Sequence, residues 1–267
     1  MQKADKIVKK WYKTLGFPKK YDQSFYNELK KQRALNGSTI EQYDKTCDDG
    51  KLNLISFLYF CENTAKYYKQ KHIPKKILVD TLKDIVTWTV EWSDIKGRLY
   101  LGELAWLTRH LSGKLFKVGR LQFCMAGAEH DISQYGIKKG DNVLEIHIPK
   151  GGRLDKKEVQ ESIARAKVFF AKYFGEYSYG YFTCHSWLLD ETLKKYLPHD
   201  SNIIKFGEMF DKTSSDKSNA VIRYVFRWDT NEENLAHAVS NSNFAKKIQN
   251  AVLDGEQFYE VLGVIPR

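Results

Sequence analysis

LEIHIPKGGRLDKKE, residues 144–158, joins an alternating apolar strand pattern to a glycine-containing turn and then to the start of a helix. Successive side chains of a strand point to opposite faces, so the apolar residues share one face while Glu145 and His147 share the other. A charged carboxylate is not placed against a packed core without a partner. We therefore expect this second face to line a cleft or a wet edge of a sheet.

The turn at residues 150–153, Lys-Gly-Gly-Arg, stands directly before the helix. The helix is predicted to begin at Asp155, because Glu158 follows three residues later in a variant of the capping box. Backbone amides of a glycine turn at a helix N-terminus suit an anion, and Lys150 and Arg153 add positive charge. Gly-Gly before a helix cap is also ordinary turn chemistry. From these residues alone, a phosphate cradle and a plain connector remain equally open.

The segment after the turn completes a strand–helix–strand unit. Apolar residues of 156–174 fall on one helical stripe, and YFTCHSWL, residues 181–188, alternates as a second strand. Such a crossover is right-handed in nearly all cases and makes the two strands parallel. If the strands are neighbours, His147 and His185 project into the same space near the carboxyl ends, where open α/β sheets bind ligands.

The rest of the chain divides into a helical part and a mixed part. Residues 1–113 follow helical patterns, whereas residues 114–267 alternate and carry turn signals. We predict an α+β protein with an all-helical N-terminal domain over 1–113 and a mixed α/β domain with a central βαβ unit over 114–267. Within the second domain we expect strands at 114–123, 202–210 and 220–228, a hairpin loop at 211–219 and a helix at 234–253.

Composition limits the class of protein. At 267 residues, with 42% hydrophobic and 14% aromatic residues, the chain can bury a real core. No apolar run approaches the roughly 18 to 20 residues that span a bilayer, and the charged N-terminus does not resemble a signal peptide. We expect a soluble protein with no membrane partner. The cysteines have no metal-ligand spacing, so we expect no metal site and a reducing cytoplasm; they are Cys47, Cys61, Cys124 and Cys184.

The positive charge lies mainly in the first half of the chain. The formal net charge is +10, and residues 1–113 carry 21 Lys and Arg against 13 Asp and Glu, whereas the remainder carries 22 against 20. A basic surface can serve nucleic acid or an anionic membrane face. The lysines are spread singly along amphipathic patterns, however, which is typical of a solvated helix face. We therefore favour the solvated face over a nucleic-acid partner.

Four segments resemble a known family in sequence and in order. They are IPKKILVDTLKDIVTW, LGELAWLTRHLSGKLFKVGRLQF, VLEIHIPKGGRL and YFTCHSWLLDETLKKYLPHDSNIIKF. They are similar to bacterial acyltransferase domain-containing proteins, which join a helical N-acyltransferase N-terminal domain to a GNAT-like C-terminal domain. The resemblance extends from about residue 50 to the end, and HIPKGG and CHSWLLD are its most specific parts.

The resemblance implies that acetyl-CoA or another acyl-CoA lies between two splayed parallel strands, with its diphosphate on the loop before the next helix. The expected loop residues are Ile148, Lys150, Gly151, Gly152, Arg153 and Leu154. The usual GNAT loop pattern, Q/R-x-x-G-x-G/A, is absent, and Gly151-Gly152-Arg153 must replace it. The apolar segment FYEVLGVIP, residues 258–266, is also not needed by the simplest version of the fold.

Acyl transfer to an amine requires a base, a polarised carbonyl and a proton for the leaving thiolate. The candidate bases are Glu145 and His147, although an ion pair or a hydrogen bond within the sheet would explain them equally well. His185 is a candidate for a substrate contact or a structural role. Tyr196 stands roughly where GNAT enzymes place their acid, with a packing role as the alternative. A nucleophilic pair of Cys184 and His185 is rejected, because adjacent strand residues face opposite ways.

The sequence thus predicts an N-acyltransferase that moves an acyl group, acetyl in the first instance, from CoA to a small-molecule or peptide amine. A catalytically inactive GNAT-like binding module is the first alternative. A nucleic-acid-associated protein that uses its basic helical half is the second. The acceptor, the acyl-chain length and the oligomeric state are not specified by the sequence.

Overall fold

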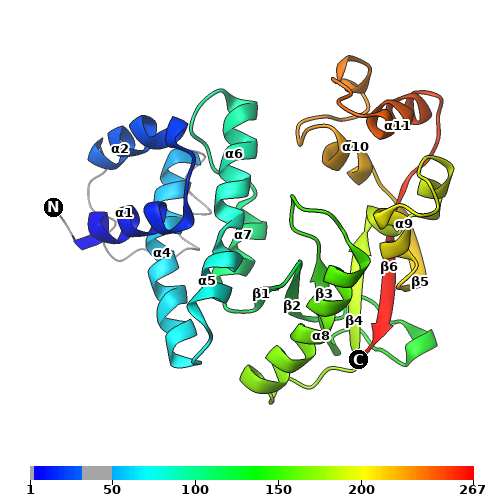
Figure 1. Ribbon diagram of the computed structural model, residues 1–267, viewed down its shortest axis with the longest axis horizontal. Coiled ribbons are helices and arrows are strands. Elements are labelled where there is room, and N and C mark those ends of the chain that lie inside the picture. Colours follow the sequence, from blue (N-terminus) through cyan, green and yellow to red (C-terminus); the bar gives the residue numbers. More distant parts are fainter. Residues whose placement is uncertain (1–2, 32–49) are drawn as a thin grey trace. The chain divides into compact units, whose positions relative to one another are not determined.

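The computed structural model describes residues 3–31 and 50–267, and Figure 1 shows the arrangement of the elements. The chain forms two compact units, Met1–Lys117 and Val118–Arg267. Cys47 lies outside the described residues. The described cysteines are all free thiols: Cys61, Cys124 and Cys184.

The first unit is helical, as its sequence pattern predicts. Its helices are α1 (Lys3–Leu15), α2 (Asp22–Lys31), α4 (Gly50–Gln70), α5 (Lys75–Leu82), α6 (Asp84–Lys96) and α7 (Leu104–Leu111). Helix α4 is central, because α1, α2, α5, α6 and α7 all contact it. Its Leu54 and Leu58 are completely buried. No helix in the described ranges is long and apolar enough to cross a membrane.

Two kinds of contact hold this unit together. Aromatic rings stack near its N-terminus, where the ring centroids of Tyr12 and Phe25 lie 3.7 Å apart. A polar contact joins α6 to α7, where Nε2 of the fully buried His110 lies 3.0 Å from Oδ2 of Asp84. A buried polar pair of this kind costs more to break than an exposed one, so it fixes the position of α7 on α6.

The chain continues into a six-stranded sheet with the order β1-β2-β3-β4-β6-β5. The strands are β1 (Leu115–Val118), β2 (Leu121–Gly127), β3 (Asn142–His147), β4 (Tyr181–Ser186), β5 (Asp211–Lys217) and β6 (Tyr259–Pro266). Strands β3 and β4 are parallel, while β2/β3, β4/β6 and β5/β6 are antiparallel. The predicted βαβ unit is confirmed, with α8 (Lys156–Tyr173) as its crossover helix.

Helix α8 begins at the predicted N-cap and covers one face of the sheet. The carboxylate of Asp155 accepts hydrogen bonds from the amides of Lys157 and Glu158. On the covered face the rings of Phe123 and Phe182 meet at 5.9 Å between centroids. On the opposite face an apolar cluster around Val143 and Val264 covers one end of the strands. Glu145 and His147 lie on the same face beyond it, where they are partly exposed.

Several elements of the second unit differ from the sequence prediction. Residues 202–210, expected as a strand, contain helix α9 (Asn202–Gly207), whose N-cap Ser201 accepts a hydrogen bond from the amide of Ile204. Short apolar runs do not distinguish strand from helix, and here the cap decides. Residues 220–228 contain helix α10 (Ala220–Val225), because burial of Val221 overrides the strand preference of the β-branched residues.

Three further segments differ from their predicted secondary structure. Residues 211–219, expected as a hairpin loop, contain the edge strand β5, whose largely exposed residues give no apolar alternation. The segment 258–266, which the predicted fold did not need, provides β6 between β4 and β5. The predicted helix at 234–253 is shorter, and consists of α11 (Asn243–Leu253) after a 3₁₀ turn, η5 (Leu235–His237).

Candidate active site

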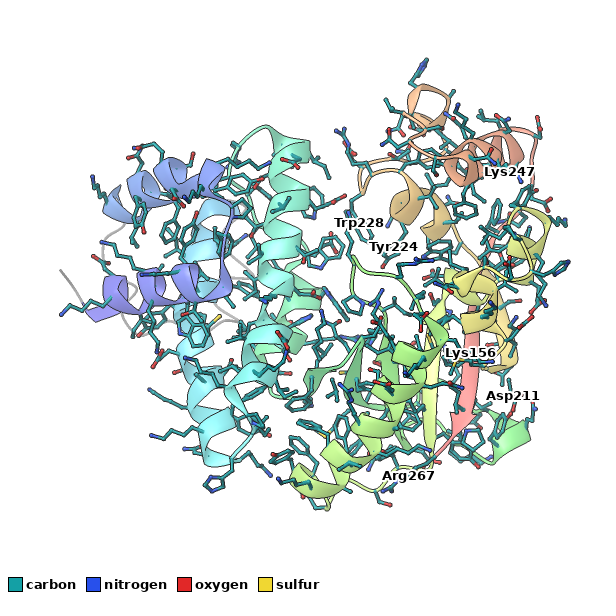
Figure 2. The ribbon with its side chains drawn as sticks, in the orientation of Figure 1. Lys156, Asp211, Tyr224, Trp228, Lys247 and Arg267 are labelled. Atoms are coloured by element: carbon teal, nitrogen blue, oxygen red, sulfur yellow. The ribbon has the colours of Figure 1, made fainter. Side chains whose placement is uncertain are left out.

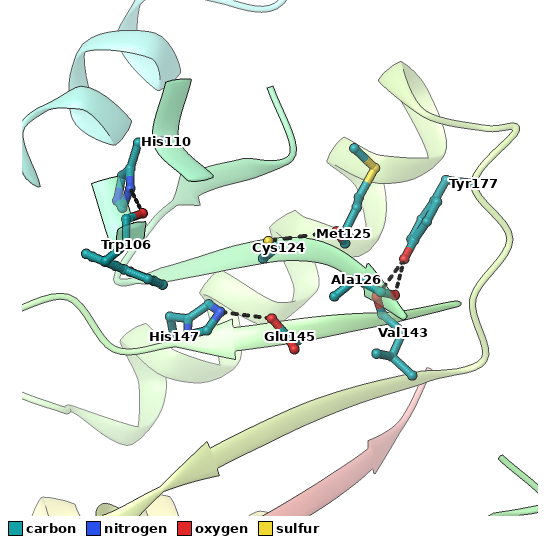
Figure 3. A network of polar contacts seen from close by, with 9 residues as sticks. All are labelled: Trp106, His110, Cys124, Met125, Ala126, Val143, Glu145, His147 and Tyr177. Carbon is teal, nitrogen blue, oxygen red and sulfur yellow. Dashed lines mark hydrogen bonds and ion pairs between the residues drawn. The ribbon is translucent and has the colours of Figure 1, made fainter. Parts of the chain in front are cut away.

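The parallel strands β3 and β4 separate toward their carboxyl ends. Their paired residues are Leu144 with Phe182 and Glu145 with Thr183. Beyond these pairs β3 stays paired with β2 as far as His147, and β4 stays paired with β6 as far as Ser186. The sheet therefore opens between β3 and β4 immediately after Glu145, and the strands diverge in Figure 3. Backbone groups at such an opening lack a ladder partner and are available to a ligand.

Glu145 and His147 meet on the polar face of β3. Nε2 of His147 lies 3.3 Å from Oε2 of Glu145 (Figure 3), and both side chains are partly exposed. A carboxylate at this distance orients the imidazole and favours the tautomer that carries its proton on Nε2. The pair therefore has the composition of a proton-transfer group at the mouth of the opening.

Cys124 is a third member of this polar cluster. It lies opposite Glu145 in the β2/β3 register, and it is 4% exposed. One ligand atom from each of Cys124, Glu145 and His147 lies within 4.8 Å of the others. A thiol, a carboxylate and an imidazole at these distances could hold a small cation.

Tyr177 closes the other end of this face. Its hydroxyl lies 2.8 Å from the carbonyl oxygens of both Ala126 and Val143, which are opposite each other in β2 and β3 (Figure 3). Burial, above all, raises the pKa of Tyr177 to about 12, so its hydroxyl stays protonated and can donate at neutral pH. The hydroxyl of Tyr177 thus links β2 to β3 at the end where the chain connects these two strands.

The turn after β3 is held from outside by Arg120. The guanidinium donates hydrogen bonds to the carbonyl oxygens of Pro149 (3.1 Å), Gly152 (3.2 Å) and Arg153 (2.9 Å). Both turn glycines have left-handed backbone angles, with φ of 83° at Gly151 and 73° at Gly152, which few other residues adopt. The exposed side chain of Lys156 follows at the first turn of α8 (Figure 2).

The remaining loop residues differ in burial. Lys150, Gly151, Gly152 and Arg153 are exposed, Ile148 is partly buried, and Leu154 is 9% exposed. Exposed glycines beside exposed cations suit a polyanion, whereas a buried leucine anchors the loop to the core. The described residues contain no hydrogen-bond acceptor for the amides of Gly151, Gly152 and Arg153.

His185 lies on the same face of the sheet as Glu145, but its side chain is directed toward the edge that β5 forms. Its Nε2 is 3.9 Å from Oδ2 of Asp216 on the edge strand β5. Cys184 points to the opposite face, where it is 1% exposed, and burial raises the pKa of its thiol far above the usual value. The structure thus separates Cys184 from His185, as strand alternation predicts.

Tyr196 follows the 3₁₀ segment η4 (Glu191–Lys195) and lines a different hollow. Its hydroxyl donates to Oε2 of Glu256 at 2.9 Å. Burial and this hydrogen bond raise the pKa of Tyr196 to about 12. The hollow, of about 730 Å³, is lined mainly by α11 and the residues that follow it, and includes neither β3 nor the glycine turn. The structure therefore does not bring Tyr196 into the polar cluster.

Arg120 and Cys124 are the site residues that the sequence interpretation missed. Residues 114–123 were expected as one strand, but they form a hairpin whose two-residue turn is Gly119 and Arg120. Gly119 has a φ of 76°, and a glycine between alternating apolar residues is a known hairpin signal that could have located the turn. No local signal predicts that Cys124 lies opposite Glu145, because that register depends on how β2 pairs with β3.

Comparisons with known proteins agree with this architecture. Residues 4–113 match the N-acyltransferase N-terminal domain, and residues 115–265 match the GNAT-like C-terminal domain. No curated protein matches the sequence.

Solved structures share the fold at low sequence identity. An acyltransferase in complex with decanoyl-CoA and teicoplanin superimposes with a TM-score of 0.76 at 21% identity, over 97% of this chain and 87% of that chain. An acyltransferase mutant in complex with octanoyl-CoA gives the same TM-score, identity and coverage. An acyltransferase in complex with decanoyl-CoA alone gives 0.74 at 22% identity, over 97% of this chain and 86% of that chain.

Proposed function

The chain belongs to the family defined by the GNAT-like C-terminal domain and is an acyltransferase, and we propose that it transfers an acyl group from an acyl-CoA to an amine. The observation that carries the proposal is the opening between β3 and β4 directly beyond Glu145. An acyl thioester between the strands would place its carbonyl beside the edge of β3 that has separated from β4. The glycine turn would then receive the diphosphate.

The reaction divides into steps that the site residues can support. The amine must lose a proton to become nucleophilic, and His147, oriented by Glu145 at 3.3 Å, is the proposed acceptor of that proton. The amine nitrogen attacks the thioester carbonyl, an amide bond forms, and the carbon–sulfur bond breaks. A backbone amide of β3 facing the opening is proposed to stabilise the developing oxyanion. After the attack the nitrogen loses a second proton, which passes to solvent, and the proton held by His147 returns to the departing thiolate, which leaves as CoA.

The donor and acceptor are proposed by chemical class. Acetyl-CoA is the donor expected from the sequence, but the solved structures of the same fold contain octanoyl-CoA and decanoyl-CoA. We therefore extend the proposed donors from acetyl-CoA to decanoyl-CoA. The proposed acceptor is a small-molecule or peptide amine, and one similar structure contains the glycopeptide teicoplanin.

Calorimetric titration and turnover assays test this function. Acyl-CoAs from acetyl to decanoyl are titrated into the full chain, and CoA release is followed with a panel of amines that includes teicoplanin. We expect binding of at least one acyl-CoA and amine-dependent release of CoA. Binding without turnover on any amine would favour the inactive binding module, and no binding at all would reject the proposal.

Variants of the polar pair test the assigned chemistry. His147→Ala should lower kcat about 10² to 10⁴-fold, the usual contribution of general acid–base catalysis, while the Kd for acyl-CoA stays constant. Glu145→Gln should have a smaller effect, and the double variant should lose less than the product of the two, because residues in contact are not additive. His199→Ala, at an exposed position, is the matched control. Full activity of both single variants would refute the assignment.

A further inference from the structure

We propose that Arg120 is the positioning residue that prepares the glycine turn for the CoA diphosphate, an inference that rests on the proposed function. Arg120 lies outside the turn, 29 to 33 residues earlier in the sequence. It nevertheless donates to three carbonyl oxygens of that turn through three different nitrogens. One side chain thus fixes the orientation of three peptide groups.

The orientation of these peptides decides where the amides point. A trans peptide is planar, and its N–H is directed opposite to its C=O. Since the carbonyls of Pro149, Gly152 and Arg153 face Arg120, the amides of Lys150, Arg153 and Leu154 are directed away from it. The left-handed angles of Gly151 and Gly152 allow the chain to make this reversal without strain from a side chain.

The amides of this turn form a suitable anion site. The amide of Arg153, which Arg120 directs outward through the carbonyl of Gly152, has no acceptor among the described residues, and neither have the adjacent amides of Gly151 and Gly152. Successive backbone amides that point to one side make a concave site for phosphate oxygens. If Arg120 did not bond these carbonyls, the peptides of the turn could rotate. Their carbonyl oxygens would then face the anion site and repel a phosphate.

The guanidinium is suited to this task in both shape and charge. Its planar fork presents donors in fixed directions, whereas a lysine ammonium is a single flexible point charge. Burial lowers the pKa of Arg120, but a guanidinium remains charged at neutral pH. Its positive charge offsets the carbonyl dipoles behind the turn and adds to the attraction for a diphosphate in front of it.

The hairpin that carries Arg120 is itself fixed to the core. The hydroxyl of Ser162 on α8 accepts a hydrogen bond from the amide of Leu121 at 3.0 Å and donates to the carbonyl of Val118. These two residues flank the turn that contains Arg120. The same helix that begins after the glycine turn therefore also holds the arginine that shapes it.

A comparison of two donors tests the role of Arg120. One donor is the acyl-CoA that the wild-type protein binds, and the other is the corresponding acyl-N-acetylcysteamine thioester, which has no phosphate. We expect Arg120→Ala to raise the KM for acyl-CoA about 10- to 100-fold, with a small change in kcat and none in the KM for the phosphate-free thioester or the amine. Arg120→Lys should restore only part of the acyl-CoA affinity. Arg165→Ala, an exposed arginine on α8 paired with Glu161, should resemble the wild type.

The outcomes separate this inference from the proposed function. If the wild type binds CoA and Arg120→Ala binds it equally well, or if both donors are affected equally, Arg120 has no positioning role and only this inference fails. If the wild type binds no acyl-CoA, the proposed function fails with it. Should Arg120→Ala not fold, amide NMR of the wild type and of Arg120→Lys during CoA titration decides. We expect CoA to shift the amides of Gly151, Gly152 and Arg153 in the wild type and to shift them less in Arg120→Lys, and equal shifts in the two proteins would overturn the inference.

Discussion

Replacement of Ser162 by alanine should destabilise the second unit and also weaken CoA binding. Ser162 is completely buried, and its hydroxyl bridges the amide of Leu121 and the carbonyl of Val118. Both of these residues are themselves buried. Ser162→Ala therefore removes one hydrogen-bond partner from each of two backbone groups that water does not readily reach.

The magnitude follows from these two groups. A buried polar group left without its partner costs about 1–3 kcal/mol. The hairpin turn can relax until the amide of Leu121 bonds the carbonyl of Val118, so we expect a total of about 1–3 kcal/mol instead of twice that. For a unit of this size, each kcal/mol corresponds to about 2–4 °C in Tm, which gives a decrease of roughly 2–12 °C.

Scanning calorimetry of the full chain measures this effect, with Ser178→Ala as the control at an exposed serine. The control should melt within about 1 °C of the wild type, since exposed substitutions change stability little. Because the hairpin carries Arg120, Ser162→Ala should also raise the KM for acyl-CoA severalfold. A Tm equal to that of the wild type would refute the role of the hydroxyl bridge. A lower Tm with unchanged KM would show that the bridge stabilises the fold without supporting the turn.

Three further predictions address residues outside the cluster. Tyr196→Phe should leave kcat within about twofold, because the hydroxyl donates to Glu256 in a separate hollow; a loss of 10-fold or more in steady-state assays would instead support its role as the catalytic acid. The Lys10 ammonium lies 2.7 Å from the carboxylate of Glu62 and holds the pKa of Glu62 below its usual value. This ion pair therefore stabilises the folded state above the unfolded pKa of about 4.3. The stabilisation is lost as the pH falls through the lower, folded pKa. The difference in Tm between wild type and Glu62→Gln should therefore shrink between pH 6 and pH 3, and a constant difference would contradict this. Burial raises the pKa of the Cys184 thiol, so iodoacetamide at pH 8 should label it only after unfolding in urea; mass spectrometry that finds rapid labelling of the native protein would show that the thiol is accessible.

Local chemistry explains what the sequence interpretation predicted well. The capping pattern at Asp155 is confirmed, because a cap depends on residues within one turn of the helix. The parallel βαβ unit is confirmed for a related reason, since the handedness of the crossover leaves little choice of arrangement. Strand alternation likewise separates Cys184 from His185 without any knowledge of the fold.

The errors arose where local signals are ambiguous or absent. The apolar run 202–210 is compatible with strand or helix, and the Ser201 cap makes it helical. The polar segment 211–217 becomes a strand only because β6 offers it a paired edge. Edge strands are exposed and need not alternate, so their sequences resemble loops.

Local sequence patterns are sufficient to predict the helical first part, the strand with Glu145 and His147, the glycine turn and the helix that follows it. These depend on periodicity and on contacts between residues close in the chain. Three features are visible only in the folded chain: β3 and β4 separate beyond Glu145, Cys124 lies opposite Glu145, and Arg120 bonds the carbonyls of the turn. Each of these depends on the register between segments joined by long connections. A shift of one residue in that register would reverse the faces of all the side chains concerned, and no local pattern specifies it.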